Sequence, residues 1–567
     1  MIDDFLSSEF SLQNSREAFA LLSVEVSLAR CPARRARSLI TAAAAVIVVA
    51  AAALALAAQQ PQPFDLDEAT FATLQRRLDT GQDTARTLAE KYLARIDALD
   101  RRGPTLRSVI ELNPDALTIA DELDAERKSR GPRGPLHGIP IVIKDNIATT
   151  DRMMTTAGSL ALVGVKPPQE AFIVTRLRSA GVVILGKTNL SEWANFRSTE
   201  STSGWSARGG QTLNPYALDR SPSGSSSGSA VAAAANLAAG AIGTETSGSI
   251  ISPAQANSLV GIKPTVGLLS RTGIVPISHT QDTAGPMTRT VADAAALLNA
   301  MAATDPDDDA TEGQRVADYT RSLDANGLKG ARIGVVRRRL FGNSAEVDRI
   351  AEAAIADMKA RGAIIVDPTD IATLGTFDDA ELDVLLYEFK ANVNKYLGAL
   401  GPASPVHSLK DVIDFNNAHR DDELRYFGQE LFQLAEAKGP LTEEVYRRAR
   451  VDAWGYAGTY GIDGVMAKYQ LDALVAPTGG PAGVINLERG DDRNAMIPGL
   501  AGIAAVAGYP HLTVPAGFIG GLPVGISFVG RAWSEPTLIK LAYAYEQATK
   551  HRRAPTFAPT AASPVTQ

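Results

Sequence analysis

The chain has 567 residues, with 56 basic and 63 acidic side chains and a formal net charge of −7. This balance, without a long Lys/Arg run in the body, argues against nucleic acid as a main partner. The single cysteine, Cys31, excludes a disulfide framework and a cysteine-based metal site, and the six histidines lack zinc-site spacing. We therefore expect one large α/β core without a metal or an organic cofactor.

Residues 1–58 have the pattern of a leader. A basic cluster at 30–37 precedes an uncharged apolar run at about 39–57 that ends in Ala55-Leu56-Ala57. These are the parts of a secretory signal peptide, with cleavage near Ala57 or Ala58. The run is also long enough to cross a bilayer of ~30 Å, so an uncleaved membrane anchor is the alternative. Either way we expect export, to the periplasm or beyond, with membrane attachment only if the leader remains.

The body opens with two amphipathic helices, at 71–78 and 88–99, whose apolar residues recur at helical spacing. Two apolar runs follow, at 138–143 and 181–185, and both predict buried strands. Lys144 and Asp145 end the first strand, and Lys187 follows the second. Gly-Lys-Thr at 186–188 suggests a phosphate loop, but the first glycine of that motif would be Gly181, which opens a strand. Nucleotide binding is therefore not expected.

Residues 221–253 are the stretch around which the chain is organised. A run of Gly and Ser usually forms a flexible linker. Here it leads into 230–239, an alanine-rich segment that predicts a buried helix. A second Gly/Ser turn follows at 246–249. Glycines let the backbone approach a bound group, and successive N–H groups bind anions, so this stretch predicts a nucleophile together with oxyanion donors.

The motifs at 223–229, 243–250, 261–265 and 282–289 resemble the amidase signature family. Within it, the run that begins at Ser221 is most similar to bacterial peptide amidases, and the resemblance covers about 65–545. It implies a Ser-cisSer-Lys triad made of Ser249 as nucleophile, Ser225 as bridging serine after a cis peptide bond, and Lys144 as base. It also implies an oxyanion hole from the N–H groups of Thr246, Ser247, Gly248 and Ser249, supported by Ser226 and Gly224.

Proton transfer to Lys144 sets a condition on its surroundings. The amine must be neutral, so its pKa must lie several units below the ~10.4 of free lysine, through burial and without a carboxylate partner. Asp145 should therefore point away. Two residues depart from the family pattern, since Ser247 replaces a glycine and Ile251 replaces an arginine. Both departures bear on the substrate, because neither removes a member of the triad.

The resemblance implies hydrolysis of a carboxamide, the C-terminal amide of peptides, to the acid and ammonia through an acyl-enzyme. Aryl or aliphatic acylamidase activity is the alternative within the family, and the related amidotransferase subunit is disfavoured by the leader. An α/β-hydrolase esterase would use Ser226 in a Gly-x-Ser-x-Gly elbow, which needs a buried strand directly before it. A non-catalytic exported binding protein would need a lost triad residue. We expect a monomer acting on a peptide or small-molecule amide.

The remaining patterns complete the expected fold. Helices are predicted at 291–302 and 346–359, and strands at 331–336, 363–366, 471–477, 511–515 and 524–529. Strands alternating with helices predict one α/β domain over 64–553, with a central mixed twisted sheet covered by helices on both faces. Residues of about 304–450 are expected to form an insertion that covers the cleft. A proline-containing tail, 554–567, is expected to be flexible.

Overall fold

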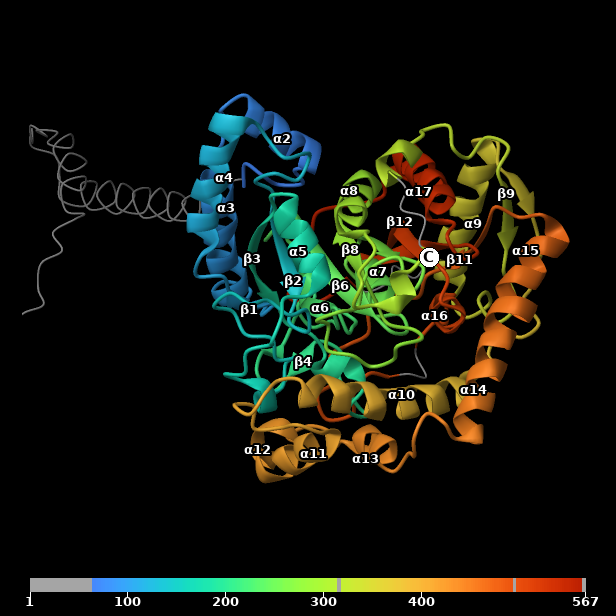
Figure 1. Ribbon diagram of the computed structural model, residues 1–567. Helices are drawn as coiled ribbons and strands as arrows, with labels where there is room; N and C mark the ends of the chain where they lie inside the picture. Colours follow the sequence, from blue (N-terminus) through green and yellow to red (C-terminus); the bar gives the residue numbers. More distant parts are fainter. Residues whose placement is uncertain (1–63, 314–317, 493–495, 563–567) are drawn as a thin grey trace, which may run out of the picture. The chain divides into compact units, whose positions relative to one another are not determined.

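An 11-stranded mixed sheet runs through the domain in the order β1-β3-β2-β6-β8-β7-β12-β13-β11-β9-β10 (Figure 1). The computed structural model describes residues 64–313, 318–492 and 496–562, so the predicted leader lies outside the described residues. The described residues from 68 onward form one compact unit, and a turn at 65–68 opens the described chain. The sheet and its helices confirm the predicted α/β fold class.

The strand that ends in Lys144, β2, has parallel neighbours on both sides. β2 pairs in parallel with β3 on one side and with β6 on the other, whereas β6 and β8 are antiparallel. The strands of the sheet are β1 Val109–Leu112, β2 Pro140–Lys144, β3 Val183–Thr188, β6 Gly240–Glu245, β7 Val260–Lys263, β8 Thr283–Thr288, β9 Arg332–Val335, β10 Ile364–Val366, β11 Ala473–Pro477, β12 His511–Ile519 and β13 Leu522–Val529. A separate hairpin joins β4 Trp205–Ser206 and β5 Gly210–Gln211. The strands predicted from apolar runs, among them β2, β3 and β13, lie in this sheet, whereas β1, β6, β7 and β8 were not predicted because glycine, polar or charged residues interrupt their sequences.

The helices predicted at 71–78, 88–99, 291–302 and 346–359 lie close to their predicted positions, whereas most of the others were not predicted. They are α2 Phe71–Asp79, α3 Ala85–Ile96, α4 Ala116–Arg130, α5 Phe172–Ser179, α6 Ser227–Ala234, α7 Ile251–Ala256, α8 Val291–Met301, α9 Ala345–Ala360, α10 Asp378–Gly398, α11 Leu409–Ala418, α12 Arg420–Glu423, α13 Glu430–Glu436, α14 Glu444–Trp454, α15 Gly464–Tyr469, α16 Ala501–Ala507 and α17 Glu535–Thr549. Among the described residues, none of these helices has both the length and the apolar character that a membrane crossing requires.

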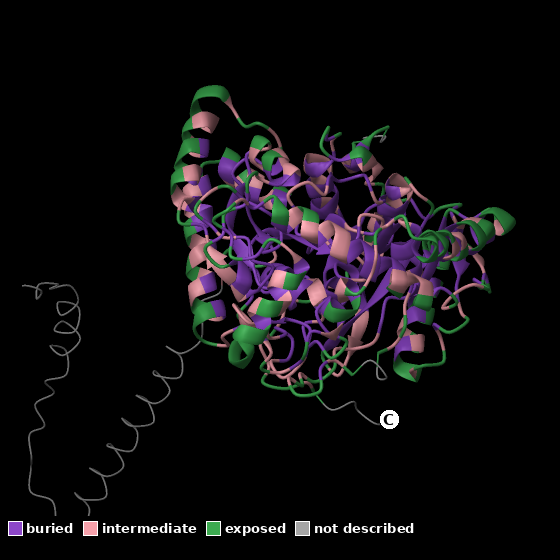
Figure 2. Cartoon of the chain, turned by 60° about the horizontal axis from the view of Figure 1, so that its bottom comes forward, coloured by how far each residue is buried: buried purple, intermediate pink, exposed green. Residues whose placement is uncertain are grey.

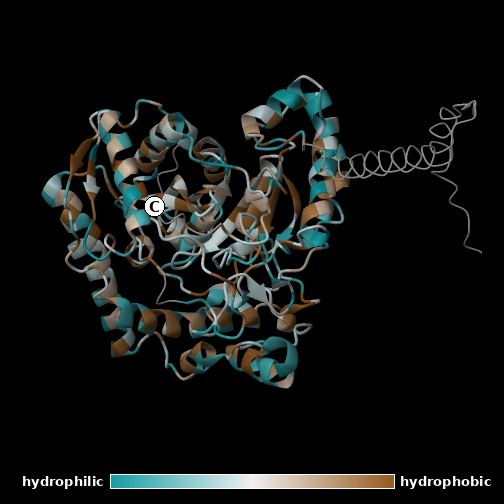
Figure 3. Cartoon of the chain, turned by 180° about the vertical axis from the view of Figure 1, so that it is seen from behind, coloured by the Kyte–Doolittle hydropathy of each residue, from teal (hydrophilic) through white to brown (hydrophobic). Residues whose placement is uncertain are grey.

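Helices cover both faces of the sheet. A Cβ on Gly243 of β6 would meet Ser226, next to α6, whereas a Cβ on Gly240 of the same strand would meet Leu297 of α8. Because these two positions of one strand are an odd number of residues apart, they face opposite sides, so α6 and α8 lie on opposite faces. Buried residues accordingly fill the strands and the inner sides of the helices (Figure 2), and apolar residues follow the same distribution (Figure 3).

The buried helix α6 differs from its predicted extent of 230–239. It begins earlier, at Ser227, and ends at Ala234. Asn236 adopts a left-handed conformation with φ of 56°, which an α-helix does not allow. The N–H of Ala239 then bonds to Pro140 O of β2, so the last alanines of the run lead into β6. The helix therefore stops because the chain must join the sheet.

The range of about 304–450, predicted as one insertion, divides into two parts. β9 and β10 extend the main sheet, because β9 pairs in parallel with β11. Helices α10–α14 form a separate layer, drawn yellow to orange, in which α10–α13 lie along the lower edge of Figure 1 and α14 rises from it on the right. Phe389 of α10 stacks on Phe432 of α13 at 5.2 Å, and Trp193 meets Phe432 edge-on at 5.7 Å. The helical layer thus packs on the segment between β3 and β4.

The segment predicted as a flexible tail is attached along its described part, up to residue 562. The N–H of Phe557 donates to Pro215 O at 2.9 Å, and that of Leu218 donates to Ala558 O at 2.9 Å. The N–H of Ala562 donates to Gly520 O at 3.1 Å. Main-chain hydrogen bonds therefore hold this segment, although it lacks an apolar period.

Gly228 allows α6 to approach its neighbours closely. A Cβ there would lie 2.3 Å from Ser108 O and 2.5 Å from Asn189 O, both main-chain atoms. We expect Gly228→Ala to lower the free energy of unfolding by about 1–3 kcal/mol, the usual range for overpacking. Gly502→Ala is the matched control, since it also lies in a helix but has no atom within 4 Å of its Cβ position. Chemical denaturation of both variants tests this, and equal stability would contradict the packing argument.

Candidate functional site

Lys144, the last residue of β2, is completely buried. Its Nζ lies 2.8 Å from Ser225 Oγ and 3.1 Å from Ser226 Oγ. The same nitrogen lies 2.9 Å from Thr244 Oγ1 and 3.2 Å from Thr244 O. Since β2 and β6 are parallel neighbours, their carboxyl ends meet at one edge of the sheet, where sites of open α/β sheets commonly form. Hydroxyl and carbonyl oxygens therefore surround the amine.

The surroundings of Lys144 favour its neutral form. Burial lowers the pKa of its amine to about 7, and the charges of Glu245 and Asp282 oppose this shift only in part. The neighbouring Asp145 turns to other partners, because its carboxylate accepts a hydrogen bond from Thr156 Oγ1 and lies 3.3 Å from Arg208 Nη1. A substantial fraction of the amine is thus unprotonated near neutral pH.

The peptide bond between Gly224 and Ser225 is cis. The carbonyl of Ser225 accepts a hydrogen bond from the N–H of Ser191 at 3.1 Å. A Cβ on Gly224 would lie 2.4 Å from Ser191 Oγ, so this position has no room for a side chain. The Ser225 hydroxyl therefore reaches Lys144 from a loop that is held between the core of the sheet and the segment after β3.

Ser226 does not occupy a nucleophile elbow. Residues 212–223, all of them described, contain no strand, so the buried strand that such an elbow requires is absent there. The Ser226 hydroxyl instead donates to Thr244 O at 2.9 Å and accepts from Thr244 N at 3.1 Å. This serine ties the loop to β6, and the α/β-hydrolase alternative is wrong.

Ser249 follows the turn after β6, and its main chain lies beside Ser226, whose N–H donates to Ser249 O at 3.1 Å. The residue is 9% exposed, at the boundary between the core and solvent. Within the described part of the chain, its hydroxyl makes no hydrogen bond. The structure thus joins Lys144 to Ser225 directly and brings the backbone of Ser249 to the same loop, with the Ser249 hydroxyl unengaged.

The predicted oxyanion loop presents free donors. Across the described residues, the main-chain N–H groups of Thr246, Ser247 and Ser249 have no hydrogen-bond acceptor. That of Gly248 lowers the pKa of the buried Glu245 carboxylate, which accepts from the N–H groups of Ile250 and Ile251 at 2.7 and 3.0 Å. Of the predicted donors, the Gly248 N–H is therefore the one that acts on a carboxylate of the chain.

The backbone explains which residue types this loop accepts. Gly248 has φ of 82°, in the left-handed region that favours glycine. Ser247 is not among the residues with positive φ, so a serine fits where the family commonly has glycine. Ile251 is completely buried at the start of α7, in a place without room for a solvated charge. Both departures from the family pattern thus have a local structural reason.

Asp282 is a site residue that the sequence did not assign, although it opens one of the family motifs. Its carboxylate accepts from Thr246 Oγ1 at 2.6 Å and from the N–H groups of Ile277 and Ser278 at 2.8 and 2.9 Å. Burial raises its pKa to about 6. It holds Thr246, the first residue of the predicted oxyanion loop, through a contact between segments 36 residues apart.

Helix α10 holds the segment that carries Asp282. The buried carboxylate of Glu388 accepts from Ser278 Oγ at 2.6 Å, from Thr280 N at 3.1 Å and from Tyr446 Oη at 2.8 Å. Segment 277–282, which carries Asp282, is thereby attached to the helical layer. Helix α10 is thus linked through this segment to the loop predicted to carry the oxyanion donors.

Lys187, the second lysine at a strand end, lies away from the serines. Its Nζ donates to Ile147 O at 2.7 Å and to Thr155 Oγ1 at 2.8 Å. Burial lowers its pKa to about 8, with the charge of Asp145 opposing the shift. This lysine therefore has a structural role between β3 and the loop after β2.

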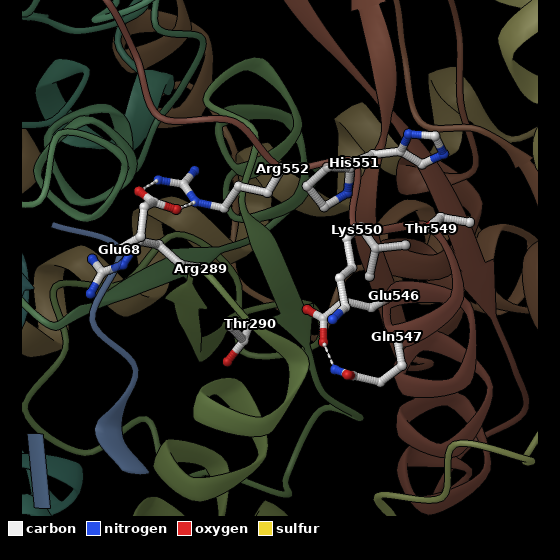
Figure 4. A pocket seen from close by; sticks show the side chains of 11 residues that line it. Glu68, Arg289, Thr290, Glu546, Gln547, Thr549, Lys550, His551 and Arg552 are labelled. Atoms are coloured by element: carbon white, nitrogen blue, oxygen red, sulfur yellow. Dashed lines mark hydrogen bonds and ion pairs between the residues drawn. The ribbon is translucent and has the colours of Figure 1, made fainter. Parts of the chain in front are cut away.

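A cavity of about 260 Å³ lies elsewhere, between the end of α17, the start of α8 and β12 (Figure 4). Its charged lining is paired internally, because Arg552 donates to both carboxylate oxygens of Glu68, at 2.7 and 2.8 Å. Glu546 accepts from the N–H of Val291 at the start of α8. None of the predicted catalytic residues lines this cavity.

The mixed α/β sheet, with a buried lysine and two serine-bearing loops at one edge, defines a class of enzyme, the hydrolases that cleave carboxamide C–N bonds. Comparison with known families is decisive, and the chain belongs to the amidase family, whose model matches residues 87–539. The predicted family and the predicted amidase activity are thus confirmed.

Relatives match over most of their length. A probable amidase of Arabidopsis thaliana is 42% identical over 506 residues, covering 87% of this chain and 92% of that protein. The crystal structure of peptide amidase from Stenotrophomonas maltophilia is 54% identical, with a TM-score of 0.83, covering 87% of this chain and all of that one. A putative amidase of the fission yeast Schizosaccharomyces pombe is 37% identical over 533 residues, covering 88% of this chain and 88% of that protein.

Proposed function

We propose that this amidase hydrolyses the C-terminal carboxamide of peptides to the acid and ammonia, through an acyl-enzyme on Ser249. The observation that carries the mechanism is the buried Lys144 amine, 2.8 Å from Ser225 Oγ, with its pKa lowered to about 7. The likeness to the peptide amidase of Stenotrophomonas maltophilia, over 87% of this chain, supports the substrate class.

In the first half-reaction, Ser249 Oγ attacks the amide carbonyl carbon. Its proton passes to Ser225 Oγ while the proton of Ser225 passes to neutral Lys144, which becomes ammonium. The free N–H groups of Thr246, Ser247 and Ser249 bind the oxygen on which negative charge develops. Lys144 then returns a proton through Ser225 to the leaving nitrogen, and ammonia departs from the acyl-enzyme.

In the second half-reaction, water attacks the acyl carbon. The same relay takes a proton from the water to Lys144 and returns it to Ser249 Oγ, which releases the acid. The lysine ends each cycle neutral, so no external base is consumed. In the free enzyme the Ser249 hydroxyl is unengaged, and the bond from Ser249 to Ser225 forms in the substrate complex, as catalytic hydrogen bonds often do.

The substrate class is tested with the purified chain and two substrates that share one acyl group, an amidated peptide and the corresponding anilide. We expect ammonia release from the amidated peptide with a kcat/KM at least about tenfold above that for aniline release, a difference of ~1.4 kcal/mol. Release of aniline alone would overturn the peptide-amide assignment and favour the acylamidase alternative.

Export and a monomeric state are further proposals, which rest on the sequence of 1–58 and on a proposed mechanism that requires no second chain. N-terminal sequencing of the protein recovered after expression with its leader tests cleavage near Ala57. Size-exclusion chromatography with light scattering tests the monomer.

A further inference from the structure

A carboxyl group from the helical layer reaches the oxyanion loop. Glu381 lies in the first turn of α10 and is half-buried. Its Oε1 accepts a hydrogen bond from Gln281 Nε2 at 3.0 Å. The same Gln281 nitrogen lies 3.3 Å from Thr246 O, so one amide group links the carboxyl to the backbone of the loop.

Ser247 provides the second contact with this carboxyl. Its hydroxyl lies near this carboxyl and lowers the pKa of Glu381, which favours the ionised form of the glutamate. Ser247 is exposed and lies two positions before Ser249, whereas Thr246 and Gly248 are half-buried. The pair therefore lies on the solvent-facing side of the loop that carries the proposed nucleophile.

The proposed mechanism does not use this pair. The carboxyl of Glu381 is not part of a structural ion pair. It accepts a hydrogen bond from the Gln281 amide and lies near a hydroxyl, and the charged group that acts on it is another acid, Asp378. Burial raises the pKa of Glu381 to about 7, while Gln281 and Ser247 lower it. Glu381 thus places an acidic group beside the loop of the proposed nucleophile, with hydrogen-bond donors and no cation among the groups that act on it.

We propose that Glu381 and Ser247 form an acceptor site that distinguishes the carboxamide substrate from its carboxylate product. A primary amide carries two N–H donors on the nitrogen that will leave, which a carboxylate can accept. The acid product has an anionic oxygen at that position, which a neighbouring carboxylate repels. The pair thus determines specificity for the amide over the acid and promotes product release. This inference rests on the proposed function, since it needs Ser249 as the point of attack.

The inhibition constant of the acid product tests this directly, at pH 8.5, where the Glu381 carboxyl is ionised. Glu381→Gln has nearly the same shape but no charge, so we expect the acid to bind about 5–10-fold more tightly to this variant than to the wild type. Ser247→Ala keeps the charge of the Glu381 carboxylate and removes the hydroxyl beside it. We expect it to raise the KM for the primary amide about threefold, with kcat changed less.

Asp379→Asn is the matched control, because it removes one negative charge from an exposed position in the same turn of α10. Its inhibition constant for the acid should equal that of the wild type. An unchanged constant in Glu381→Gln, or an equal change in Asp379→Asn, would overturn the inference. The inhibition constant of the acid can be measured with any amide that carries the same acyl group. Failure of this inference can therefore be told apart from failure of the peptide-amide assignment, which the anilide comparison tests.

Discussion

Replacing Ser249 by alanine is expected to lower kcat for amide hydrolysis by at least ~10⁴-fold, the scale seen when a nucleophile is removed from a serine hydrolase. The hydroxyls of Thr246 and Ser226 are not available to replace it, because the first donates to Asp282 and the second is bonded to β6. The free energy of unfolding should change by less than about 1 kcal/mol, since the hydroxyl makes no hydrogen bond within the described structure. Ammonia release and thermal unfolding measure the two quantities.

Two further serine variants make this result specific. Ser252→Ala removes a hydroxyl that bonds only to Ser223 Oγ, at 2.9 Å, and should keep kcat within about threefold of the wild type. Ser226→Ala removes one acceptor of Lys144 and both bonds to Thr244, so an intermediate loss is expected together with lower stability. Full turnover by Ser249→Ala would refute the serine mechanism, and a complete loss in Ser226→Ala alone would reassign the nucleophile.

The parts of the site that could be predicted are those fixed by local sequence. A strand of β-branched residues that ends in lysine places Lys144 at the sheet edge, whichever strands lie beside it. Successive Gly and Ser residues predict a loop with free N–H groups, because no side chain in it can bury apolar area. Both features persist in the fold. The family resemblance then assigned roles that spacing alone left open.

The parts that could not be predicted depend on contacts between distant segments. Thr244 became a partner of Lys144 through the parallel pairing of β2 with β6, across 100 residues of chain. Glu381 and Glu388 reach the site from a helix that sequence alone identified only as covering the cleft. The end of α6 at Ala234 likewise reflects the need to enter β6, which overrides the helix propensity of the alanines that follow.

Lys144→Met is expected to reduce kcat/KM by ~10³–10⁴-fold, because it fills the same volume but cannot accept the proton. Lys144→Arg should be inactive at every pH, since a guanidinium stays protonated. In the wild type, protonation of Lys144 removes the base, so kcat/KM should fall about tenfold per pH unit below about 7 and level off above it. The midpoint follows from burial, which disfavours the charged amine more strongly than Glu245 and Asp282 favour it.

Lys187→Met is the control for removing a buried lysine. It leaves Ile147 O and Thr155 Oγ1 without their donor, so stability should fall by about 1–3 kcal/mol. The midpoint of the pH profile should stay near 7, because Lys187 contacts none of the serines in the described structure. If Lys187→Met shifted the midpoint of the pH profile and changes around Lys144 did not, the base would be assigned to another residue. Full activity of Lys144→Met would lead to the same conclusion. Asp282→Asn adds a positive test, since removal of a negative charge that favours the ammonium form should move the midpoint to lower pH.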